Sequence, residues 1–168
     1  MAEEAASAAA RERPSLRIQR HFDDIAPQQV WQAWTDPKAL SVWFGPGEDH
    51  SVLHARTDVR VGGSFCIAFR LQNGDEHEVS GVYREVVTNK SLVFTWTWRA
   101  TPERESLVSV RLAPTATGTR MDFLHEQFFD QAERDSHEGG WLPTIDKLGR
   151  FVALCPRSSS TMTERTTP

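Results

Sequence analysis

The stretch that decides the fold is LVFTWTW, residues 92–98. Phe94, Trp96 and Trp98 stand at alternate positions, and because successive side chains of a strand point to opposite faces, the three rings share one face. Rings of this size must either pack in a core or line a cavity.

The same period of two extends on both sides of this strand, from residue 50 to residue 126, and every interruption is a turn signal. Asn73-Gly74 is the strongest of these signals, since the dipeptide favours the tight turn of a hairpin. We therefore expect a continuous antiparallel meander of six strands. Leu16, Ile18 and Phe22 alternate with polar residues and predict one further strand before it.

Two short helices are expected between the first strand and the meander. Pro27 suits the first position of a helix, and the apolar residues within 30–34 recur at helical spacing. Asp36 is a good N-cap for a second helix that starts at Pro37. The sequence Gly45-Pro46-Gly47 then ends that helix.

Residues 130–154 return to helical spacing and predict a long C-terminal helix. The apolar residues of this helix form one stripe along its length, and that stripe needs a surface to pack on. Pro143 lies within the helix, and because an interior proline removes a backbone hydrogen bond and clashes with the preceding turn, we expect a kink or a break there. The apolar stripe consists of Trp141, Ile145, Leu148 and Val152.

The chain has 168 residues, of which 39% are apolar and 25% charged, an ordinary balance for one globular domain. A formal charge of −4 and the lack of a basic run argue against nucleic acid as a partner. No stretch approaches the ~18 apolar residues of a membrane helix, so no membrane insertion is expected. Cys66 and Cys155 are too few for a disulfide framework and fit a reducing cytoplasm, which is the expected location.

A single domain is expected over residues 15–156. Residues 1–14 contain no apolar residue larger than Ala after Met1, and residues 157–168 are mostly polar. Both ends are expected to be disordered tails, because they have too little apolar surface to offset the entropy of ordering.

An ordered set of motifs carries a family resemblance over about residues 15–154. The set resembles the START-like (SRPBCC) superfamily and, within it, the family named after the C-terminal domain of the activator of heat-shock protein 90 ATPase. The motifs are Ala26-Pro27-x-x-Val30-Trp31-x-Ala33-Trp34-Thr35-Asp36-Pro37, Leu40-x-x-Trp43-Phe44-Gly45-Pro46, Asp58-x-Arg60-Val61-Gly62-Gly63-Ser64-Phe65, Gly81-x-Tyr83-x-Glu85-Val86, Leu92-Val93-Phe94-Thr95-Trp96, Gly118-Thr119 and Gly140-Trp141.

The resemblance implies an α+β helix-grip fold, in which a curved antiparallel β-sheet wraps around a long C-terminal helix and two short helices follow strand 1. It also implies a cavity between the sheet and that helix, which much of the superfamily uses to hold an apolar or amphipathic small molecule. Because one fold hosts many functions, the function must be argued from the site itself.

The aromatic side chains of the inner sheet face either line such a cavity or simply fill the core. His125 shares that face and is a candidate polar anchor or acid/base, with a hydrogen-bonded structural histidine as the alternative. Tyr83 is the only tyrosine, and its phenol either orients a ligand or makes a structural hydrogen bond. The candidate ligand-binding residues are Phe69, Tyr83, Phe94, Trp96, Trp98, Phe123, His125 and Trp141.

Other reactive residues carry weaker signals. His137 lies near the start of the C-terminal helix, where exposure to solvent or helix capping is expected. The spacing of His125, Glu126 and Glu133 matches no known metal motif, so no metal and no cofactor is expected. The two cysteines have no neighbouring activating group in the sequence and are expected to be buried, inert thiols.

Three functional hypotheses remain, and binding of a hydrophobic small molecule such as a lipid, a polyketide-like compound or an aromatic metabolite is preferred. The second is a cyclase- or hydrolase-type enzyme in which His125 or Tyr83 moves a proton, although the sequence has no convergent acid/base pair. The third, a chaperone ATPase activator, is the weakest, because activators that resemble this family carry a further N-terminal domain that residues 1–14 cannot supply. A homodimer is left open.

Overall fold

The computed structural model describes residues 12–45, 47–48 and 51–155. The tails expected at 1–14 and 157–168 therefore lie outside the described residues, except for residues 12–14. Within that short segment, the carbonyl of Pro14 accepts a hydrogen bond from the backbone N–H of Phe128 at 3.3 Å.

Seven strands and three helices make up the described part of the chain, in the predicted order. The expected strand 1, pair of short helices, six-strand meander and C-terminal helix are all confirmed. The elements are β1 (Leu16–Asp23), α1 (Pro27–Thr35), α2 (Pro37–Trp43), β2 (Ser51–Thr57), β3 (Ser64–Arg70), β4 (Glu76–Val87), β5 (Ser91–Trp98), β6 (Ser106–Pro114), β7 (Gly118–Glu126) and α3 (Gln131–Leu154).

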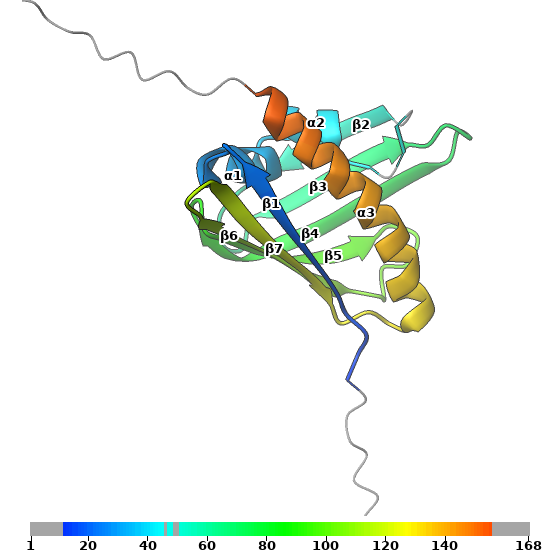
Figure 1. Cartoon of the computed structure of the whole chain (residues 1–168). Helices are drawn as coiled ribbons and strands as arrows, with labels where there is room; N and C mark the ends of the chain where they lie inside the picture. The colour runs from blue at the N-terminus through cyan, green and yellow to red at the C-terminus, as the bar shows by residue number, and fades with distance from the viewer. Residues whose placement is uncertain (1–11, 46, 49–50, 156–168) are drawn as a thin grey trace, which may run out of the picture.

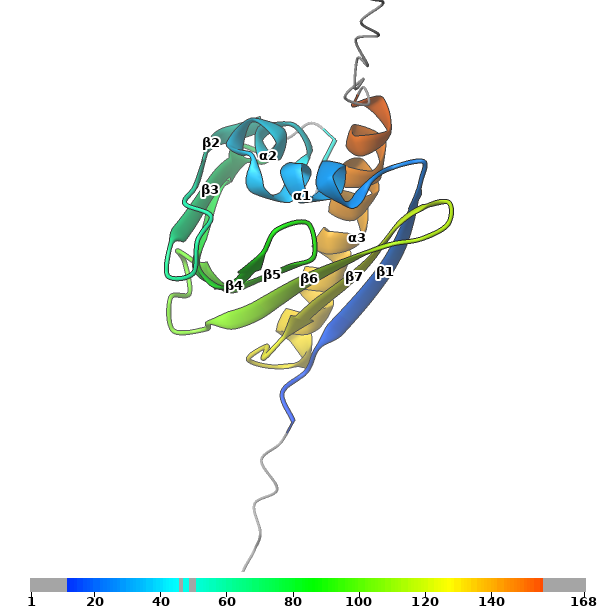
Figure 2. The same ribbon diagram turned by 90° about the vertical axis from the view of Figure 1, so that its left-hand side faces the viewer.

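The strands form one antiparallel sheet in the order β1-β7-β6-β5-β4-β3-β2. The first strand pairs with the last, with Leu16 opposite His125, so the N-terminal strand completes the sheet beside the end of the meander. The sheet curves, α3 crosses its concave face, and α1 and α2 lie at one end of the opening (Figures 1 and 2). This is the START-like helix-grip arrangement that the family resemblance implies.

Local sequence explains the two short helices. Pro27 and Pro37 each occupy the first turn of a helix, and the Asp36 side chain accepts a hydrogen bond from the backbone N–H of Lys38 at 2.9 Å. After α2, Gly45 has a φ of 111°, a value that residues with a Cβ rarely adopt, and the chain turns away.

Helix α3 packs the predicted stripe against the sheet, since Trp141, Ile145, Leu148 and Val152 are all buried. Of the kink or break expected at Pro143, the break is wrong, because α3 runs as one helix through that residue, and the kink stays a prediction. An interior proline costs about 3 kcal/mol relative to alanine. Burial of the stripe side chains on both sides of Pro143 contributes more free energy to the stability of the helix than the proline costs.

No described helix is long and apolar enough to cross a membrane.

Candidate functional site

A pocket of about 880 Å³ opens between α3 and the ends of β3, β4 and β5. The first half of α3 forms one wall, the three strands form the other, and the residues after α2 close one side. Its lining residues are Phe44, Gly45, Ala68, Phe69, Leu71, Glu76, His77, Glu78, Trp96, Trp98, Arg99, Ala100, Thr101, Ser136, His137, Gly140, Trp141 and Thr144.

Aromatic rings in mutual contact make up the inner wall of the pocket. The centroid of Trp96 lies 5.0 Å from that of Trp141 and 5.4 Å from that of Trp98. Phe69 meets Trp98 edge to face at 6.2 Å, and Phe44 lies 6.1 Å from Trp96. Tilted and edge-to-face pairs of this kind are the favoured arrangements of aromatic rings, so the wall is packed in its low-energy geometry.

His137 brings a polar group to this wall from α3. The indole N–H of Trp98 donates to Nε2 of His137 at 2.9 Å, so Nδ1 carries the ring proton and donates to the backbone carbonyl of Glu133 at 2.8 Å. Burial lowers the pKa of His137, more than its bond to Glu133 raises it. The imidazole is therefore neutral at neutral pH, with both nitrogens engaged.

His125 lies behind the pocket, wholly buried in the core. Trp141 donates its indole N–H to Nδ1 of His125 at 3.0 Å, which leaves the ring proton on Nε2, 2.7 Å from the Ser106 hydroxyl oxygen. Burial, and then the nearby His137, lower the pKa of His125 well below that of an exposed histidine. Its role is to hold the Trp141 indole in place.

A second, much smaller cavity of about 20 Å³ lies deeper in the core, and Tyr83 and Phe94 line it together with Trp34 and Trp96. Tyr83 is 3% exposed, and burial raises the pKa of its phenol, so it stays protonated. The indole N–H groups of Trp34 and Trp96 are buried and have no hydrogen-bond partner among the described residues.

The structure divides the predicted site residues among three places. Phe69, Trp96, Trp98 and Trp141 line the large pocket. Of the other four, Tyr83 and Phe94 border the small cavity, whereas Phe123 and His125 are core residues that line neither space.

Of the residues that line the pocket, the sequence predicts only four as site residues, and His137, Phe44 and Arg99 are among those that it does not predict. His137 was expected at the surface, yet it lies one helical turn before Trp141, and extending the apolar stripe by four residues would have found it. Phe44 is predicted only for the apolar side of α2, and its place in the pocket follows from the contact of its ring with Phe69 of β3 at 5.9 Å, which the sequence does not reveal.

Neither cysteine is a buried thiol as predicted, since Cys66 and Cys155 are both half-buried. The side chain of Cys66 faces away from Phe65 and Ile67 as expected, and it lies on the outer face of the sheet and not in the interior. Burial, and then the neighbouring carboxylate of Glu78, raise the pKa of its thiol.

The chain matches one family model and superposes on solved structures of the same fold. The family model described as "Activator of Hsp90 ATPase homolog 1-like protein" matches residues 24–153. The AHSA1 protein of Silicibacter pomeroyi superposes with a TM-score of 0.74 at 28% identity, covering 84% of this chain and 99% of that one.

A protein of Nitrosomonas europaea superposes with a TM-score of 0.71 at 27% identity, covering 83% of this chain and 94% of that one. No curated protein matches the sequence.

Proposed function

The chain belongs to the Activator of Hsp90 ATPase homolog 1-like family, and from this membership together with its aromatic pocket we propose that it binds a hydrophobic or amphipathic small molecule between the sheet and α3. Lipids, polyketide-like compounds and aromatic metabolites are the ligand classes that fit.

The observation that carries the proposal is the pocket itself. A space of about 880 Å³ lies within the range of roughly 300–1,000 Å³ that small-molecule sites occupy. Its deep wall consists of Trp96, Trp98 and Trp141, which offer flat apolar surfaces to a ligand. A filled core would leave no space of this size beside three indoles.

Polar groups stand at the mouth and the edge of this wall, which favours an amphipathic ligand over a purely apolar one. The exposed Arg99 lies where β5 ends and makes no side-chain hydrogen bond or ion pair with the described residues. Its guanidinium suits an acidic or strongly polar head group.

The two candidate proton-transfer residues of the enzyme hypothesis lie outside the pocket, which supports binding over catalysis. It assigned this transfer to His125 or Tyr83, and neither side chain lines the pocket. Both nitrogens of His125 are occupied by Trp141 and Ser106, so the ring has no free position for a substrate.

Fluorescence titration with N-phenylnaphthylamine, a neutral apolar probe, tests the proposal. Saturable binding at one site per chain, with a shift in tryptophan emission, is expected. Trp98→Ala should weaken the probe by about tenfold, the equivalent of one lost aromatic contact. Phe129→Ala is the matched control, because Phe129 is 57% exposed and does not line the pocket.

A second titration, with anilinonaphthalene sulfonate, tests the amphipathic part. This anionic probe should be weakened by Arg99→Gln, whereas the neutral probe should not. Equal loss of both probes, or none, would contradict a head-group role for Arg99. If neither probe nor a panel of lipids bound the folded protein saturably, the pocket proposal itself would fail.

A further inference from the structure

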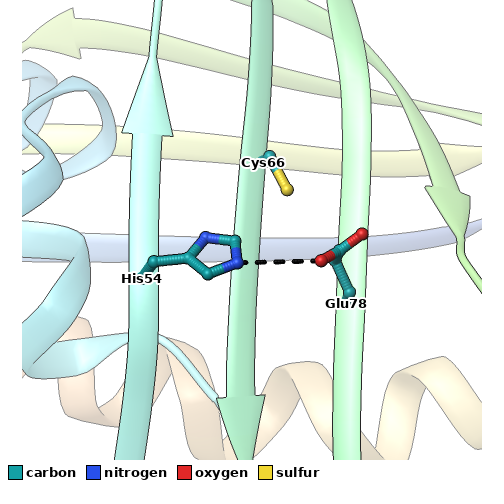
Figure 3. Close-up of side chains that lie close together, drawn as sticks. All are labelled: His54, Cys66 and Glu78. Carbon is teal, nitrogen blue, oxygen red and sulfur yellow. Dashed lines mark ion pairs between the residues drawn. The ribbon is translucent and has the colours of Figure 1, made fainter.

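Three metal-ligating side chains of different chemistry meet on the outer face of the sheet, on the side away from the aromatic wall. His54 comes from β2, Cys66 from β3 and Glu78 from β4, and Figure 3 shows all three directed toward one point above β3. One potential ligand atom from each residue lies within 4.8 Å of the other two. Each of the three side chains is half-buried.

Strand register explains why these residues converge. Ala68 of β3 pairs with His54 on one side and with Glu78 on the other, so the three stand in one row across the sheet. The methyl group of Ala68 leaves space above β3, into which the two longer side chains reach. Cys66 lies two residues from Ala68 on the same face and completes a triangle.

A β-bulge contributes to this placement. The pairing of β2 with β3 shifts between Val52 and His54, directly before the histidine. Bulges bend a strand and redirect the side chains beside them. Without the shift, the alternation of side chains along β2 would place the His54 side chain on the face of the sheet opposite to that of Ala68.

The ligand atoms are not committed to hydrogen bonds within the described protein. Nδ1 of His54 is buried without a partner there, and Nε2 lies 3.7 Å from a carboxylate oxygen of Glu78, which is beyond hydrogen-bonding distance. Neither nitrogen of His54 is therefore held by a hydrogen bond to the described residues, so either one is available to an ion.

We propose that His54, Cys66 and Glu78 form a binding site for a divalent transition-metal ion, with Zn²⁺ as the best match to the ligand set. Zinc combines imidazole nitrogen, thiolate sulfur and carboxylate oxygen at metal–ligand distances of about 2.0–2.3 Å, which places ligand atoms about 3.3–3.6 Å apart in a tetrahedron. On binding, the separations of up to 4.8 Å would close to these values by rotation about side-chain bonds.

Charge and solvent access fit the same ion. On binding, the Cys66 thiol gives up its proton to solvent, so one thiolate and one carboxylate neutralise the two positive charges of the metal. Because the three side chains are half-buried, water completes the fourth position, as in zinc sites with three protein ligands.

The ion would join the edge strand β2 to β3 and β4. Glu78 also borders the proposed ligand pocket, but it pairs with Ala68, one position from the Phe69–His77 pair, so its side chain lies on the opposite face of the sheet from Phe69. The inference therefore does not depend on the proposed ligand. The sequence predicted no metal, and it gave no recognisable motif because the ligands stand twelve positions apart on separate strands and not within one loop.

Titration of the untagged, metal-free full chain with CoCl₂ tests the site directly. A thiolate-to-cobalt charge-transfer absorption band is expected at one ion per chain, and ZnCl₂ should abolish it by displacement. Cys66→Ser should remove the band while leaving the circular dichroism spectrum unchanged. Cys155→Ser is the matched control, since Cys155 lies at the end of α3 and outside the cluster, and it should retain the band.

Zinc affinity then tests the two remaining ligands. Competition with a chelating dye should show His54→Ala and Glu78→Gln binding Zn²⁺ at least about tenfold more weakly than the wild type, with folding retained. Zinc should also raise the melting temperature of the wild type but not of Cys66→Ser. Absence of the cobalt band in the wild type, an unchanged band in Cys66→Ser, or one ion per two chains would each overturn the proposal.

Discussion

Trp141→Ala is the change that most directly tests how the helix and the sheet depend on one another. Trp141 is 4% exposed, and its ring centroid lies 4.6 Å from that of Phe123 and 5.0 Å from that of Trp96. Removing a buried aromatic ring costs about 3–5 kcal/mol of the free energy of unfolding. Leaving Nδ1 of His125 without its donor costs about 1–3 kcal/mol more.

The total loss is therefore about 4–8 kcal/mol, which lowers the melting temperature of a domain this size by at least about 8 °C. Trp141→Phe separates the two contributions, because it keeps an aromatic ring and removes only the indole N–H and a small volume. Its expected loss is about 1–3 kcal/mol. Urea denaturation followed by far-ultraviolet circular dichroism measures both variants without depending on tryptophan emission.

Leu142→Ala is the control for helix propensity at the next position, since Leu142 is 40% exposed. It should change the free energy of unfolding by no more than about 0.5 kcal/mol. A Trp141→Ala protein that melted within about 2 °C of the wild type, or no lower than Leu142→Ala, would refute the reasoning. The stripe of α3 would then not be held against the sheet by this ring.

Other predictions follow from the buried imidazoles and from two glycines. Burial lowers the pKa of His125 and His137, so the folded protein disfavours their charged forms. Their contribution to the free energy of unfolding is therefore fully present above the unfolded histidine pKa of about 6.5. It falls by up to about 1.4 kcal/mol per pH unit for each ring as the pH drops below that value. Equal urea midpoints at about pH 7.5 and about pH 5.5 would contradict this. Gly81→Ala should lower stability by about 3 kcal/mol or more, measured by thermal melting, because its Cβ would lie 1.8 Å from the carbonyl oxygen of Thr95. Gly139→Ala should instead raise stability by up to about 1 kcal/mol, since no atom lies within 4 Å of its Cβ; a loss of similar size would show that α3 needs glycine there.

The fold could be predicted because its signals are local. Alternation of polar and apolar residues marks strands, and capping residues such as Asp36 mark helix starts, whatever the rest of the chain does. Pro143 is the residue at which the prediction of a helix break from the sequence fails. A break there follows from backbone chemistry alone, and the helix persists because neighbouring side chains such as Trp141 and Ile145 are buried against other elements.

The site could be predicted only in part, because it depends on where elements cross. Alternation places Phe94 and Trp98 on one face of β5, yet only Trp98, near the end of the strand, lies where the pocket opens. The cluster of His54, Cys66 and Glu78 depends on strand register and on a bulge, and neither can be read from one strand at a time.

The two interior histidines explain how this core accommodates its indoles. A buried indole N–H needs an acceptor, but backbone carbonyls inside a sheet are already used by the strand ladders. A neutral imidazole solves this problem, because it accepts on one nitrogen and donates on the other. Trp98 thus reaches the backbone of α3 through His137, and Trp141 reaches the Ser106 hydroxyl of β6 through His125. Both rings are held in fixed orientations beside the pocket, so the ligand that we propose would meet an aromatic surface that is already ordered, which would reduce the entropy lost on binding.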